Sequence, residues 1–131
     1  MGADLVEETL PSGDFADGVM AASGAVFLAE RVADGVRILR SVGTDRTEIA
    51  LVPCGFTGLE RVGDGHVAVG RDVRSCSDGT PGVTVFDVAT GRAVAEGAEE
   101  GGGALAVTGS PDGARLAVAC PDGRVRTYRL P

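Results

Sequence analysis

The sequence predicts an all-β fold built from repeated hairpins, and three observations carry this prediction. Asp-Gly pairs recur 44 residues apart, at Asp34-Gly35, Asp78-Gly79 and Asp122-Gly123. Each pair lies between two runs rich in Val, Leu, Ile, Phe or Tyr. About twelve such runs follow one another at the spacing of roughly 8–12 residues expected of short strands, and no stretch shows the period of an amphipathic helix.

The three Asp-Gly pairs are interpreted as structural turns. Glycine, and to a lesser extent aspartate, tolerates the positive φ that a tight hairpin requires. The alternative is a ring of carboxylates around a metal ion. Because equal spacing in a repeat already explains the three aspartates, we expect turns and no metal site.

The repeat length predicts the architecture. A period in the low forties with hairpin chemistry is typical of β-propeller blades, and the chain of 131 residues is close to three such periods. We therefore expect a single domain of about three four-stranded antiparallel blades. The first would span about residues 14–52, the second 56–98 and the third 103–130.

The charge of the chain limits its partners. The net charge is −7, and no stretch collects basic residues with interleaved aromatics. This argues against nucleic acid or an anionic membrane as a partner, because either requires a cationic surface. No apolar run approaches the roughly 18 residues that span a bilayer. Solubility accounts for the acidity, and a basic protein partner is the alternative.

The cysteines Cys54, Cys76 and Cys120 form an odd, widely spaced set, which favours a reducing cytoplasm. Cys76 and Cys120 share a Cys-x-Asp-Gly context, but their separation does not match the close ligand spacing of zinc sites. Equivalent positions in neighbouring blades usually also lie beyond disulfide distance. We expect buried thiols at both positions.

No catalytic constellation is found in the sequence. His66 is the only histidine, and it directly follows the Asp64-Gly65 turn without a serine or cysteine motif around it. The glycines at 101–103 lack the lysine and the helix of a phosphate-binding loop. The sequence therefore predicts no catalytic residue, no metal and no cofactor.

One loop is a candidate partner-binding rim. Residues 71–82 (RDVRSCSDGTPG) are longer than the corresponding loops of the other two units. Extended loops on one rim commonly carry binding residues, although a tolerated insertion is the alternative. The candidate contact residues are Arg71, Asp72, Arg74, Asp78 and Thr80.

Two stretches resemble the WD40 family. Residues 110–113 (SPDG), followed by 115–117 (RLA), resemble the first hairpin of a WD40 blade, and residues 85–91 (VFDVATG) resemble its third strand and the following turn. The chain departs from the family because no Trp precedes Asp87 and because its only Gly-His dipeptide lies in a hairpin. The resemblance implies a divergent WD40-like propeller.

The resemblance also has implications for assembly. Labelled by the family's strand order, the chain begins with a spare outer strand at residues 5–10 and ends on the third strand of its last unit. Three blades are too few to close a ring. We expect residues 5–10 of a partner copy to complete the third blade in a six-bladed homodimer, or a complementary propeller chain to close the ring.

The expected function is a non-catalytic protein-protein interaction scaffold, which rests on fold-level analogy. One alternative is a small-ligand-binding or hydrolase/lactonase-type propeller with acidic residues in a central channel. Another is a fragment of a longer propeller-containing regulatory protein.

Overall fold

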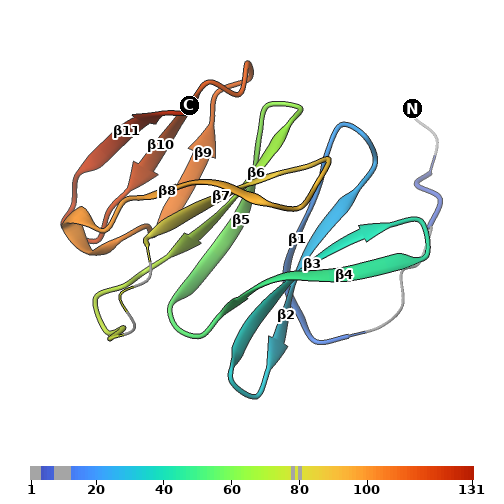
Figure 1. Ribbon diagram of the computed structural model, residues 1–131, viewed down its shortest axis with the longest axis horizontal. Coiled ribbons are helices and arrows are strands. Elements are labelled where there is room, and N and C mark those ends of the chain that lie inside the picture. Colours follow the sequence, from blue (N-terminus) through green and yellow to red (C-terminus); the bar gives the residue numbers. More distant parts are fainter. Residues whose placement is uncertain (1–3, 8–12, 78, 80) are drawn as a thin grey trace.

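The computed structural model describes residues 4–7, 13–77, 79 and 81–131. Three antiparallel sheets stand side by side in a row (Figure 1). The only helical element in the described residues is the short 3-10 turn Glu100–Gly102, and none of their helices is long and apolar enough to cross a membrane. The all-β prediction is confirmed.

The first two sheets have four strands each, in the orders β1-β2-β3-β4 and β5-β6-β7-β8. The third has three, in the order β11-β10-β9. The strands are β1 (Phe15–Met20), β2 (Val26–Val32), β3 (Gly35–Val42), β4 (Asp45–Val52), β5 (Phe56–Val62), β6 (His66–Arg71), β7 (Val83–Asp87), β8 (Ala93–Gly97), β9 (Ala106–Gly109), β10 (Arg115–Ala119) and β11 (Val125–Arg129).

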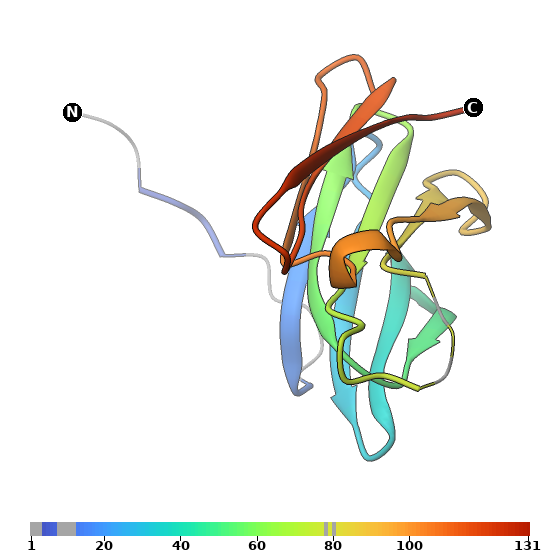
Figure 2. The same ribbon diagram turned by 90° about the vertical axis from the view of Figure 1, so that its left-hand side faces the viewer.

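The third sheet has one strand fewer than the other two. In the described part of the chain, no strand pairs with the side of β11 that faces away from β10. The strand expected at residues 5–10 lies partly outside the described residues. Residues 4–7 belong to no strand, Leu5 and Val6 are exposed, and the segment extends away from the sheets (Figure 2).

Two of the Asp-Gly pairs lie in hairpin turns. Val32 pairs with Gly35, so Asp34 is the second residue of a two-residue turn between β2 and β3. Asp122 and Gly123 lie between β10 and β11, where the Gly123 N–H donates to the Cys120 carbonyl at 3.0 Å. Gly79 lies in the longer loop between β6 and β7, and Asp78 is outside the described residues.

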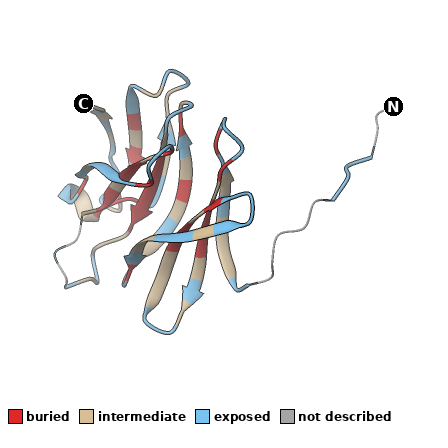
Figure 3. Ribbon diagram, turned by 45° about the vertical axis from the view of Figure 1, so that its right-hand side comes forward, coloured by how far each residue is buried: buried red, intermediate tan, exposed pale blue. Residues whose placement is uncertain are grey.

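The middle sheet is packed on both faces. Successive side chains of a strand point to opposite faces, and here Val67 and Phe86 pack toward the first sheet, whereas Ala68 and Val85 pack toward the third. All four are buried, as are most residues of β6 (Figure 3). This burial explains why β6 and β7 are apolar runs without a strict polar alternation.

The first strands of the three sheets hold the row together. β5 contacts β1 on one side and β9 on the other. The Leu59 N–H donates to the Asp17 carboxylate at 2.9 Å, and the Thr57 hydroxyl donates to the Ala104 carbonyl at 2.9 Å. These two polar side chains therefore connect the middle sheet to its neighbours at one edge.

Replacing Gly123 by valine should destabilise the fold by about 1–3 kcal/mol, because its φ of 88° is strained for a side chain. Open space surrounds its Cβ position, so any effect reports the backbone. Gly65 is the matched control, since it also lies in a turn with open space but without a positive φ. Urea unfolding of Gly123→Val and Gly65→Val should separate the two, and equal stabilities would contradict the assignment.

Candidate functional site

Three connecting segments meet beside the middle sheet, at the end where β5 begins and β6 ends, and we call this region the junction. It comprises residues 54–55 between the first and second sheets, 71–76 after β6, and 102–104 before β9. The Asp72 N–H donates to the Gly55 carbonyl at 2.8 Å, and the Val73 N–H donates to the Gly102 carbonyl at 2.9 Å. The 71–76 segment is thereby bonded to both neighbouring connections.

Glycines make this close approach of backbones feasible. Gly55 and Gly103 both have positive φ, and a Cβ at either would collide with the backbone of the 71–76 segment. The Ala104 N–H donates to the Arg71 carbonyl at 2.7 Å, next to the bridge between Asp72 and Gly103. The glycine run at 101–103 thus has a structural role in bringing β9 beside the middle sheet.

A disulfide joins Cys54 to Cys76 across the junction, with Cα atoms 5.9 Å apart. The prediction of a free thiol at Cys76 is therefore wrong. The loop after β6 folds back onto the connection before β5, which brings together two cysteines 22 residues apart. Cys120 is free and buried, as predicted. The argument for a cytoplasmic location loses its support from unpaired cysteines and stays a prediction.

Arg71 belongs to the interior of the junction. The residue is 4% exposed, and its Nε donates to the Cys54 carbonyl at 2.9 Å. Its predicted role as a contact for a binding partner has to be corrected, because a buried guanidinium is inaccessible to a second protein. The residue instead fixes the connection that carries Cys54.

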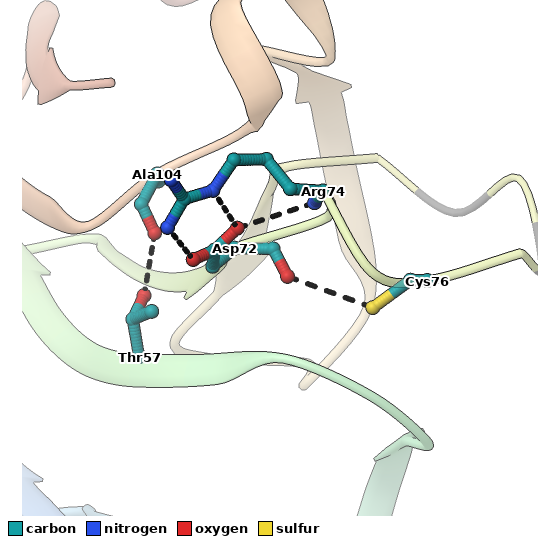
Figure 4. Close-up of polar contacts among 5 residues, drawn as sticks. All are labelled: Thr57, Asp72, Arg74, Cys76 and Ala104. Atoms are coloured by element: carbon teal, nitrogen blue, oxygen red, sulfur yellow. Dashed lines mark hydrogen bonds and ion pairs between the residues drawn. The ribbon is translucent and has the colours of Figure 1, made fainter. Parts of the chain in front are cut away.

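Arg74 is exposed, but its charge is paired with Asp72 (Figure 4). The guanidinium donates to both carboxylate oxygens, with Nη2–Oδ2 at 2.7 Å and Nε–Oδ1 at 3.1 Å. Hydrogen bonds from Arg74 hold the pKa of Asp72 below its ordinary value. These two candidate contact residues remain on the surface as one neutral pair. The other two, Asp78 and Thr80, lie outside the described residues.

Asp34 and Asp122, the two turn aspartates that the structure describes, lie in turns of different sheets. Asp34 lies at the end of the first sheet and is exposed. Asp122, on the third sheet, accepts from both Nη atoms of Arg126, at 3.2 and 3.0 Å. Hydrogen bonding to Arg126 lowers the pKa of Asp122. In the part of the chain that the structure describes, no three His, Cys, Asp or Glu residues gather as metal ligands.

His66 has no catalytic partner set in the described residues around it. It opens β6, is half-exposed, and pairs through its backbone with Asp87. The Asp87 carboxylate accepts from the Thr90 hydroxyl at 2.8 Å and from the Thr90 N–H at 2.9 Å. These bonds lower the pKa of Asp87 and cap the turn before β8. The Asp87 carboxylate beside His66 therefore stabilises the turn before β8.

Two grooves between sheets are the other candidate sites. One lies at the end opposite the junction, and Arg40 reaches across it to donate to the Val88 carbonyl at 2.8 Å and the Ala89 carbonyl at 3.0 Å. The other is apolar and lies between β8 and β11. It is lined mainly by Val83, Val85, Ala95, Leu116, Tyr128 and Leu130.

Comparison with known proteins found no family model that matches the chain, and no curated protein or solved structure with significant similarity to it.

The disulfide and the burial of Arg71 are the features that sequence reasoning missed. Cys76 was compared with Cys120 because the two share a local context. The partner is Cys54, which lies in a different context, in the connection that leads into β5 of the same sheet. The signal available was the length of the loop after β6, which is sufficient to fold back onto that connection.

Arg71→Ala should lower the free energy of unfolding by about 2–4 kcal/mol, because it removes a buried hydrogen-bonding group and leaves a space beside the disulfide. Arg74→Ala is the matched control and should change it by less than about 1 kcal/mol, as is usual for an exposed ion pair. Urea titration followed by circular dichroism measures both. Similar losses in the two variants would refute the structural role assigned to Arg71.

Acid should destabilise the fold partly through Asp122. Its folded-state pKa is depressed, so the ionised carboxylate stabilises the fold above the unfolded value of about 3.9. This contribution is lost as the pH falls through the folded-state pKa. When the pH falls from 7 into the acidic range, the free energy of unfolding should decrease less in Asp122→Asn and in Arg126→Gln than in the unmodified chain. A double variant that loses still less would show that the two residues act independently.

Proposed function

We propose that this protein is a non-catalytic protein-interaction scaffold, a WD40-like propeller segment that completes a six-bladed ring with a second copy. The observation that carries the proposal is the unequal covering of the three sheets. The middle sheet packs against another sheet on both faces, whereas the first and third each pack against another sheet on one face only. On the outward face of the first sheet Leu28 and Leu39 are already buried, but no other sheet of the described residues covers that face. Such a face suits a further sheet of similar shape.

The outward face of the first sheet carries features of an incomplete interface. Arg46 lies over the Phe15 ring, with Cζ 5.5 Å from the ring centroid. Its Nη2 atom is buried without a hydrogen-bond partner, which costs free energy unless an acceptor is supplied. Met20, on the same face, is 60% exposed. A neighbouring sheet would cover the methionine and could supply the missing acceptor.

The open side of β11 can accept another strand. The Cys120 N–H donates to the Arg124 carbonyl, and the Leu130 N–H donates to the Ala114 carbonyl. Even-numbered residues of β11 therefore face β10. The backbone groups of Val125, Thr127 and Arg129 point to the open side, where a partner strand would bond to them.

The apolar groove between β8 and β11 lies beside this open edge. A strand added to β11 would project every second side chain over the groove, toward Val85 and Tyr128. Addition of a strand thus combines backbone hydrogen bonds with apolar burial, as in other cases of strand addition.

A second copy can supply the strand. Figure 1 shows the N-terminal end of the chain and β11 at opposite ends of the row of sheets. In a two-fold ring, the N-terminal segment of each copy, including the exposed Leu5 and Val6, would add to β11 of the other. The closed arrangement would cover both outward faces of both copies.

Light scattering should give a mass near twice 13.2 kDa, and deletion of residues 1–12 should abolish the dimer. A folded monomer at every concentration would refute ring completion by a second copy. A dimer that survives the deletion would leave ring completion standing but refute the addition of the N-terminal segment to β11.

Thr127→Pro should also prevent dimerisation, because it removes an N–H on the open side of β11 without removing a β10–β11 hydrogen bond. Thr127→Ala is the matched control and should dimerise normally. Circular dichroism verifies that both variants fold. Equal dimerisation of the two folded variants would exclude β11 as the accepting edge.

A further inference from the structure

The Cys54–Cys76 disulfide connects the part of the junction that is otherwise least attached. The bond runs from the connection before β5 to the segment of residues 72–77. Asp72 and Val73 have backbone bonds to both neighbouring connections. For the four residues that follow, the described hydrogen bonds stay within the segment: Arg74 bonds to Asp72, and the Cys76 N–H donates to the Val73 carbonyl at 3.1 Å.

Among the described residues, 74–77 are attached by these bonds to Asp72 and Val73, by packing of the Arg74 side chain against Gly102, and by the disulfide. Of these, the disulfide is the link that runs to the connection before β5. Ser75 and Ser77 are exposed, and both cysteines are half-buried, so a small reductant can reach the sulfur atoms. Neither Cys54 nor Cys76 belongs to either of the two hydrophobic cores. Breaking the bond would thus release the segment without removing side chains from the cores.

We propose that the Cys54–Cys76 disulfide is a site of thiol–disulfide exchange, and that its reduction by a dithiol releases residues 74–77 while the three sheets stay folded. One thiolate of the dithiol attacks a sulfur of the bond, forming a mixed disulfide, and the other cysteine leaves as a thiolate. The second thiol of the reductant then displaces the protein sulfur. Two electrons pass to the protein, which gains two thiols, and the dithiol becomes a disulfide.

The opening stays local because the anchor at the start of the segment does not depend on the sulfur atoms. The Asp72 and Val73 backbone bonds, together with the bond from Arg71 to the Cys54 carbonyl, hold the base of the loop in both redox states. What changes is the freedom of Arg74 and the residues that follow it. Reduction therefore converts a fixed surface segment into a mobile one, independently of whether the ring forms.

Limited proteolysis with trypsin tests this proposal, because the segment contains the Arg74–Ser75 bond and the chain has no lysine. A Cys120→Ser variant, which leaves only the two exchanging cysteines, is compared in its oxidised form and after reduction with dithiothreitol and alkylation. Products are fully reduced after quenching and identified by mass spectrometry. Cleavage after Arg74 should be at least about tenfold faster in the reduced form, as expected for local opening.

Cleavage after Arg37 and Arg115, which lie in β3 and β10, serves as the internal control and should stay slow in both forms. Equal cleavage after Arg74 in the two forms would overturn the proposal. So would an equal acceleration at all three sites, because it would mean that reduction unfolds the sheets. Combining Cys54→Ser and Cys76→Ser should reproduce the reduced pattern with an unchanged far-ultraviolet spectrum, and an oxidised-like pattern in that variant would also reject the proposed role.

Discussion

The fold depends on burial of the middle sheet from both sides. Its strands β6 and β7 supply side chains to two cores at once, so neither outer sheet has a core without it. This arrangement requires small residues where the third sheet comes close. A Cβ at Gly70 would lie 2.8 Å from the Thr57 hydroxyl and 3.3 Å from Val107. Ala68, two residues earlier on the same face of β6, is fully buried against the third sheet.

Polar side chains connect segments that the apolar cores do not reach. Asp17 and Thr57 link the first strands of adjacent sheets, and Arg71 bonds to the connection that carries Cys54. Hydrogen bonds from Thr90 in its own turn hold the pKa of Asp87 below the ordinary value, and those from Arg126 in β11 do the same for Asp122. Two of the candidate ligands or contacts, Asp72 and Asp122, are thus paired with Arg74 and Arg126 within the structure.

The parts of the fold that could be predicted are those with a local cause. Apolar runs separated by glycine-rich turns predict strands, and Asp34 and Gly123 lie in turns because short loops between antiparallel strands favour these residue types. The Cys54–Cys76 pairing and the burial of Arg71 depend on how the long loop after β6 folds back onto the connection before β5. No local sequence pattern encodes this contact. The candidate contact residues that the structure describes are accordingly a buried arginine and a surface ion pair.

The two ends of the row differ in the size of their side chains, and this gives the molecule a direction. The outward face of the first sheet carries Phe15 and Arg46 beside Leu28 and Leu39. That of the third carries Ala117 and Ala119 toward one end of β10 and the larger pair Arg115 and Arg129 at the other. Bulky side chains pack best against a surface that leaves room for them. In the proposed dimer, the bulky face of the first sheet of one copy would therefore fit the alanine-lined part of the other copy's third sheet better than a second bulky face.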